Sequence, residues 1–132
     1  MANTLEKWHK MVEDHDLSGL GSILADDAVF HSPIVHTPQV GKARVQPYLT
    51  AAFHVFLNPT FKYVREIVSE SDAVLEFVVE IDGIQVNGVD MLNFDEAGLI
   101  SEFKVMIRPL KAVNIIHEKM GEMLAAHAQR NK

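Results

Sequence analysis

DAVLEFVVEIDGIQVNGVDMLNF, residues 72–94, carries the strand pattern from which the fold class is inferred. Its first half alternates between apolar and polar residues, with Leu75, Phe77 and Val79 on one face. Asp82-Gly83 is a strong β-hairpin signal. In the second half every other residue again falls on one face: Val86, Gly88, Asp90, Leu92 and Phe94. The stretch therefore predicts two antiparallel strands joined by a tight turn.

Asp90 is the exceptional residue of this face. A carboxylate between Gly88 and Leu92 costs on the order of several kcal/mol to keep charged, unless it is paired or protonated. Strongly perturbed carboxyl groups concentrate at functional sites, which makes Asp90 the leading site residue. The alternative interpretation is that Asp90 faces solvent or binds a neighbouring backbone N–H.

Helices are predicted on both sides of further strands. Apolar residues at helical spacing indicate helices over 3–15, 16–24, 42–57 and 111–129, although Gly19 and Gly21 weaken the second. Strands are predicted over 28–32, 61–68 and 99–107, and alternation in the second of these puts Phe61, Tyr63, Arg65 and Ile67 on one face. This order indicates an α+β fold, with three N-terminal helices and a C-terminal helix around a curved antiparallel sheet. Such a sheet encloses an apolar pocket.

Composition narrows the class of protein. The 132 residues fit a single domain over 1–132, with ordinary hydrophobic (48%) and charged (23%) contents. A net charge of −6 without a basic run argues against a nucleic-acid partner, and no apolar run approaches the length of a membrane span. Cysteine is absent, and the N-terminus lacks the pattern of a signal peptide. We expect a cytoplasmic protein that acts on small molecules or on another protein.

Two local motifs are similar to those of a known group. LADDAVFHSP (24–33) and VDMLNFDEAGLI (89–100), with Gly41 before a helix, resemble the NTF2-like superfamily, specifically its SnoaL-like polyketide cyclase and ketosteroid isomerase-like branch. The resemblance covers nearly the whole chain and implies the cone-shaped α+β fold of that group. It implies no cofactor, because proton-transfer enzymes of this branch use an acid–base aspartate in a shaped pocket.

The resemblance carries over only in part at the catalytic positions. Asp90 falls where ketosteroid isomerases have the aspartic acid that binds the oxyanion, Ser32 falls where their base stands, and Trp8 falls where their tyrosine stands. Serine has no useful basicity near neutral pH, and Trp8 only donates a weak N–H. The pocket outline is kept, and the residues expected to line it beside Asp90 and Ser32 are Trp8, Phe30, Leu49, Leu75, Phe77, Val79, Gly88, Leu92, Phe103, Val105 and Ile107. This lining suits a hydrophobic ligand with one or two polar groups.

The sequence gives weaker indications of a functional role for the other polar residues than for Asp90. His31 and His36 alone make a poor metal site, so no metal is expected, whereas His36 or His54 could replace the missing base. Tyr48 and Tyr63 are interpreted as packed aromatic residues with solvated hydroxyls.

The outer face of the sheet is partly apolar and partly charged. Glu76 and Glu80 face the same way as Lys104 and Arg108, which predicts cross-strand ion pairs there. The apolar residues on this face suit a homodimer interface, the common arrangement in the proteins this one resembles.

Three functions stay open from the sequence. The first is a cofactor-independent isomerase, cyclase or lyase in which Asp90 is a general acid or base on a hydrophobic carbonyl compound. The second is a binding module in which Asp90 only hydrogen-bonds its ligand, and the third is a protein-interaction module. An epoxide hydrolase arrangement ranks below these, because Arg108 alternates to the wrong face.

Overall fold

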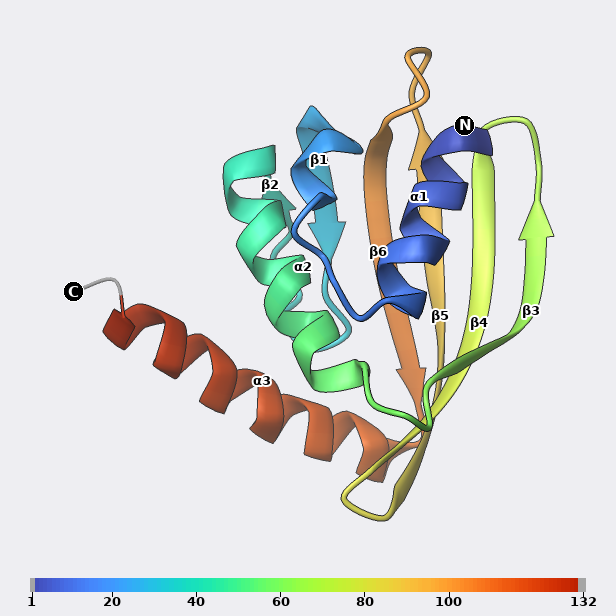
Figure 1. Ribbon diagram of the computed structural model, residues 1–132. Coiled ribbons are helices and arrows are strands. Elements are labelled where there is room, and N and C mark those ends of the chain that lie inside the picture. Colours follow the sequence, from blue (N-terminus) through green and yellow to red (C-terminus); the bar gives the residue numbers. More distant parts are fainter. Residues whose placement is uncertain (1, 131–132) are drawn as a thin grey trace.

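The computed structural model describes residues 2–130, apart from the side chains of 124 and 126–130. Its elements are α1 (Ala2–Glu13), β1 (Leu24–His31), β2 (Gln39–Val40), α2 (Lys42–Phe56), β3 (Lys62–Val68), β4 (Asp72–Ile81), β5 (Ile84–Phe94), β6 (Ile100–Arg108) and α3 (Leu110–Arg130). Helices α1 and α2 lie on the inner side of a curved sheet, and α3 runs from the end of β6 past the foot of α2 (Figure 1). The predicted α+β class is confirmed.

One predicted helix is wrong. Residues 16–24 contain only a short 3₁₀ turn, Leu20–Ser22, and β1 already begins at Leu24. Gly19 and Gly21 explain the difference, since glycine loses more backbone entropy on entering a helix than any other residue. The helices around the sheet within residues 2–130 are therefore α1, α2 and α3.

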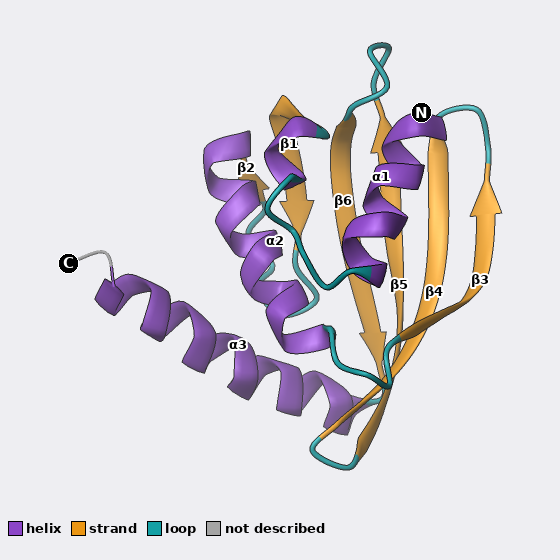
Figure 2. Cartoon of the chain, in the orientation of Figure 1, coloured by secondary structure: helices purple, strands orange, loops and turns teal. Residues whose placement is uncertain are grey.

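The sheet is mixed, and its strand order is β2-β1-β6-β5-β4-β3. The prediction of a purely antiparallel sheet is wrong at one place, because β1 runs parallel to β6 and pairs Phe30 with Phe103. The local sequence of β1 carries no information about this partner, which comes from the far end of the chain. Figure 2 shows the strands as one bent layer with the helices on its inner side.

The predicted hairpin is confirmed, and it sets the register around Asp90. Asp82 and Gly83 have positive φ angles of 51° and 79°, as a tight hairpin turn requires. The pairing that follows places Asp90 between Leu75 of β4 and Val105 of β6. Alternating residues of β4 and β5 are buried, so the predicted inner face is confirmed as well.

Strand β3 contains a bulge that the sequence pattern did not predict. Tyr63 pairs with Phe77, but Arg65 already pairs with Glu76, so Val64 is the extra residue. The bulge reverses the alternation, and Arg65 and Ile67 consequently lie on the outer face, contrary to the prediction. Glu66 is instead opposite Leu75, on the inner side with Tyr63.

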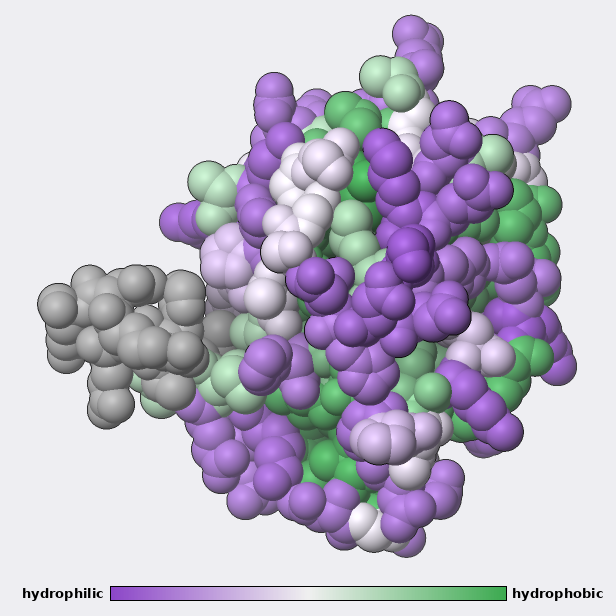
Figure 3. Space-filling view, viewed as in Figure 1, coloured by the Kyte–Doolittle hydropathy of each residue, from purple (hydrophilic) through white to green (hydrophobic). Residues whose placement is uncertain are grey.

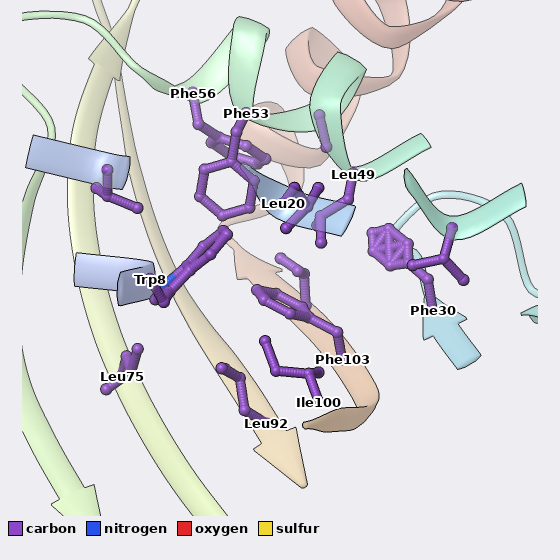
Figure 4. Close-up of a cluster of buried hydrophobic side chains, with 14 of the residues drawn as sticks. Trp8, Leu20, Phe30, Leu49, Phe53, Phe56, Leu75, Leu92, Ile100 and Phe103 are labelled. Atoms are coloured by element: carbon purple, nitrogen blue, oxygen red, sulfur yellow. The ribbon is translucent and has the colours of Figure 1, made fainter. Parts of the chain in front are cut away.

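Aromatic side chains fill the interior between helices and sheet. The Trp8 indole contacts Phe53 and Phe103 edge-on, with ring centroids 4.9 and 5.1 Å apart. Figure 4 shows these rings from α1, α2 and β6 directed toward one another, with Leu75 and Leu92 beside them. All five side chains are buried. The inner face of the sheet is thus covered by close-packed apolar groups.

Candidate functional site

Asp90 is the one buried acid of this apolar interior within residues 2–130, with no exposed surface. The register of β5 against both neighbouring strands explains its position, because its side chain must point to the same face as Leu75 and Val105. The interpretation that Asp90 faces solvent is therefore wrong.

Two aromatic residues connect to Asp90 by hydrogen bonds. The Tyr63 hydroxyl donates to Asp90 Oδ2 at 2.5 Å, and the Trp8 indole Nε1 donates to the Tyr63 hydroxyl oxygen at 3.0 Å. The other carboxyl oxygen, Asp90 Oδ1, is buried and has no hydrogen-bond partner among residues 2–130. Asp90 thus has one oxygen held by the protein and one free for another group.

Burial changes how Asp90 and Tyr63 ionise. Desolvation raises the pKa of Asp90 from 3.8 to about 7, against an opposing effect of the hydrogen bond from Tyr63. The pKa of Tyr63 is well above its usual value of 10.0, first because of burial and then because of the charge of Asp90. Tyr63 is consequently a neutral donor, and Asp90 changes its protonation state near neutral pH.

Tyr63 is the residue of this candidate site whose surroundings the sequence analysis predicts wrongly. Its hydroxyl is not solvated but bonded to Trp8 and Asp90 inside the molecule. Its ring is packed between Phe61 and His9, with centroids 5.2 and 5.5 Å away. Alternation places Tyr63 on one face with Phe61, Arg65 and Ile67 without indicating that this face is buried, and the distance of Tyr63 from Asp90 depends on strand pairing.

Ser32 has a local role. Its Oγ accepts hydrogen bonds from the backbone N–H groups of Ile34 and Val35, at 3.0 and 3.3 Å, in the turn after β1. No hydrogen bond joins Ser32 to Asp90 in the described part of the chain. This position, which the resemblance assigns to a base, therefore holds a turn together.

A small hollow lies beside the Asp90 strand. It has a volume of about 10 Å³, room for about one water molecule. Ser32, Val105 and Met120 are among its lining residues, together with Phe30, Pro33, Ile34, Ala52, Phe56 and Ile116. Val105 is the direct neighbour of Asp90 in the sheet, so the Val105 side chain separates the hollow from the acid.

The other expected lining residues belong to the close-packed interior. Those at most 2% exposed are Trp8, Phe30, Leu49, Leu75, Phe77, Val79, Leu92, Phe103 and Val105. Gly88 is buried under the Phe77 ring, and Ile107 is partly exposed. Phe30 and Val105 line the hollow with Ser32, and the others contribute to the surrounding core.

The histidines and outer-face charges lie away from Asp90. His36 and His54 are exposed, and no hydrogen bond connects either to Asp90 within residues 2–130. Among the described residues no three His, Asp or Glu side chains gather in a way that could hold a metal ion. The predicted pairing of Glu76 with Lys104 or Arg108 is wrong, since β5 separates their strands, and Glu76 pairs with Arg65 at 3.4 Å.

The geometry defines a class of protein: a cone-shaped α+β domain with a buried, titratable carboxyl group inside. Comparison with known proteins agrees with this class. The model of the SnoaL-like domain matches residues 5–103, three quarters of the chain, and the protein belongs to this family within the NTF2-like superfamily.

Solved structures extend the comparison. A steroid delta-isomerase from Pseudomonas aeruginosa is 38% identical with a TM-score of 0.92, over 97% of this chain and 93% of that one. An uncharacterised bacterial protein with a cystatin-like fold from Silicibacter pomeroyi is 29% identical with a TM-score of 0.89, over 98% and 90% of the two chains. None of the curated proteins matches this chain.

The described helices also bear on membrane association. Within residues 2–130, no helix combines the length and the apolar character needed to cross a membrane.

Proposed function

We propose that this protein binds a hydrophobic carbonyl compound and catalyses a cofactor-independent proton transfer on it, of the isomerase or cyclase type. The observation that carries the proposal is the unpartnered Oδ1 of a fully buried Asp90. A buried polar atom without a partner costs on the order of 1–3 kcal/mol, so a ligand oxygen that pairs with it gains binding energy.

Neutral Asp90 has the chemistry for such a ligand. Its Oδ1–H would donate a hydrogen bond to a carbonyl oxygen and stabilise the negative charge that develops there when the adjacent carbon gives its proton to a water molecule that enters with the ligand. A pKa of about 7 keeps a large neutral fraction at physiological pH. The 38% identity to a protein named as a steroid delta-isomerase supports this reaction class.

The ligand must open the interior to reach Asp90. A volume of about 10 Å³ is far below the few hundred Å³ that pockets for small molecules typically have. Ile116 and Met120 of α3 line the hollow from the helix side, and methionine is the most adaptable of the core residues. We therefore expect α3 to move away from the sheet when the ligand enters.

A purely binding function is the second candidate, and the position of Ser32 favours it. Because Ser32 Oγ is committed to the turn, it offers no base for a carbon-bound proton. In this case Asp90 would fix the orientation of an apolar ligand without turnover.

The test uses a solvatochromic ketone, 2-acetyl-6-(dimethylamino)naphthalene, whose emission shifts to the red when its carbonyl accepts a hydrogen bond. We expect binding to be roughly tenfold or more weaker at pH 8.5 than at pH 5.5, because Asp90 loses the donated proton. Asp90→Asn keeps an N–H donor and should bind with little pH dependence. Asp27→Asn, at an exposed aspartate, is the matched control and should behave like the wild type.

Turnover separates the two candidates. A β,γ-unsaturated 3-ketosteroid is incubated with each protein, and formation of the conjugated ketone is followed by absorbance. Turnover by wild type and Asp27→Asn but not by Asp90→Asn supports the enzyme. Ketone binding without turnover supports the binding function, and pH-independent binding by the wild type would contradict both.

We also propose a second copy of this chain as a partner, through the outer face of the sheet. The helices lie on the inner side of the sheet (Figure 2), and the outer face exposes Ile67 (58%), Met91 (36%) and Met106 (49%). The helix side is mostly hydrophilic, whereas hydrophobic surface appears at the β3 edge (Figure 3). An isologous contact would bury these residues in both copies.

A further inference from the structure

We propose that Trp8 and Tyr63 are positioning residues that keep the proton of neutral Asp90 on Oδ1, the oxygen available to a ligand. The proton position follows from the hydrogen-bond chain, and its use in catalysis rests on the proposed function. The chain runs in one direction, from an indole N–H through a phenol to a carboxyl group.

Trp8 sets the direction of the chain. An indole nitrogen is a donor only, so its contact with the Tyr63 oxygen at 3.0 Å assigns Tyr63 as the acceptor. If Asp90 Oδ2 also donated to this oxygen, the single Tyr63 hydroxyl proton would have no acceptor among the described residues, so Tyr63 donates it to Asp90 Oδ2 at 2.5 Å. Oδ2 is therefore an acceptor in both protonation states of Asp90. When Asp90 is neutral, its own proton belongs on Oδ1.

Packing keeps both donors in place. The Trp8 indole is fully buried between the Phe53 and Phe103 rings, 4.9 and 5.1 Å away. The Tyr63 ring has edge-on contacts with Phe61 at 5.2 Å and Phe77 at 6.4 Å. The Trp8 ring cannot turn away without displacing buried neighbours, and the half-buried Tyr63 ring is held by the buried Phe77 ring and by its two hydrogen bonds.

Beside Tyr63 and Asp90 lies one other pair of titratable side chains among the described residues, His9 and Glu66. His9 of α1 packs edge-on against Tyr63 and forms a hydrogen bond with Glu66 of β3, with 2.5 Å between Nε2 and Oε1. Asp90 itself is flanked in the sheet by apolar Leu75 and Val105. His9 and Glu66 are thus the groups whose titration must be separated from that of Asp90.

Loss of the indole N–H would release the constraint. Tyr63 could then rotate its hydroxyl and accept a proton from Oδ2, so that the proton of neutral Asp90 would be shared between both oxygens. A ligand carbonyl at Oδ1 would meet a donor for only part of the time. Trp8→Phe should accordingly weaken ketone binding several-fold at pH 5.5, although it leaves Asp90 and Tyr63 in place.

The direct test exploits the single tryptophan of the chain, whose indole N–H gives one assigned peak in a ¹⁵N–¹H spectrum. In the wild type this peak should shift with pH, with the same midpoint as the carboxyl carbon of Asp90. Tyr63→Phe should abolish this shift and raise the pKa of Asp90, since the charged form loses its donor. Tyr48→Phe is the control and should change neither the indole shift nor the pKa of Asp90. His9→Gln should leave the midpoint of the indole shift unchanged.

An indole peak that does not respond while Asp90 titrates in the wild type would overturn the proposal, whether or not any variant folds. An unchanged pKa of Asp90 in folded Tyr63→Phe would overturn it as well. These readouts need no ligand, so they are separate from the ketone experiment. Failure of ketone binding with a responding indole would instead reject the proposed function alone.

Discussion

Asp90→Asn should make the protein more stable above neutral pH, and this prediction follows from burial of a charge. The folded protein raises the pKa of Asp90 from 3.8 to about 7, so folded Asp90 holds its proton more tightly than unfolded Asp90. Because burial disfavours the charged form, Asp90 contributes least to the free energy of unfolding when it is ionised. Stability from this residue is therefore greatest below about pH 4, falls as the pH rises toward 7, and stays low above that.

The size of the effect comes from the same shift. Three pKa units correspond to about 4 kcal/mol between the neutral and the ionised protein, at about 1.36 kcal/mol per unit. Asparagine has nearly the shape of aspartic acid, and its carbonyl oxygen can accept the hydrogen bond from Tyr63. We expect the free energy of unfolding of Asp90→Asn to exceed that of the wild type by about 3 kcal/mol more at pH 8 than at pH 4.5, since part of the total is already lost at pH 4.5.

Urea denaturation followed by far-ultraviolet circular dichroism measures this difference at a fixed protein concentration. Other titrating groups affect both proteins alike and cancel in the comparison. Asp27→Asn should show no comparable gain, because that aspartate is exposed. If the free energy of unfolding depended on pH equally in Asp90→Asn and in the wild type, the prediction would be wrong. Ionisation of Asp90 would then not destabilise the folded protein.

Two further changes test the packing and the assembly. Gly88→Ala should lower the free energy of unfolding by about 1–3 kcal/mol, because a Cβ there would lie 2.4 Å from the buried Phe77 ring. Gly121→Ala in α3 is the control: its Cβ would meet no atom within 4 Å, so the change should be neutral or stabilising in the same thermal or urea unfolding experiment. An equal loss in both variants would contradict the packing account. Met106→Glu should convert a dimer of this 14.8 kDa chain to a monomer in sedimentation experiments, and Leu110→Gln, at a residue 75% exposed on α3, should not. A wild type that is already monomeric would reject the outer face as an interface.

The inner position of Asp90 could be predicted from the sequence because it depends on local alternation. Once Asp82-Gly83 fixes the hairpin, Gly88 and Leu92 place Asp90 on the buried face regardless of the rest of the chain. The burial of this face in the structure confirms that prediction. The parallel partner of β1 could not be predicted in this way, since β1 and β6 are joined by contacts across most of the chain.

Tyr63 shows where local patterns stop being sufficient. The prediction that Tyr63 shares a face with Arg65 and Ile67 was wrong, because the bulge at Val64 turns these two residues to the outer face and has no distinct residue signature. The contact of Tyr63 with Asp90 also depends on two strand pairings, which local alternation does not determine. The resemblance directed attention to Trp8 and Ser32, and the hydroxyl beside Asp90 comes from neither of them.

A measurement of the Asp90 pKa shows whether the folded protein holds a neutral carboxyl group at physiological pH. It is read from a carbon-13 NMR titration of the side-chain carboxyl groups, with Asp90→Asn identifying the resonance. We predict a midpoint near 7, as expected for a carboxyl group that is desolvated and bonded only by Tyr63 among the described residues. A midpoint near 4 would contradict it, because Asp90 would then be hydrated or fully paired and would have no proton to offer a ligand at neutral pH.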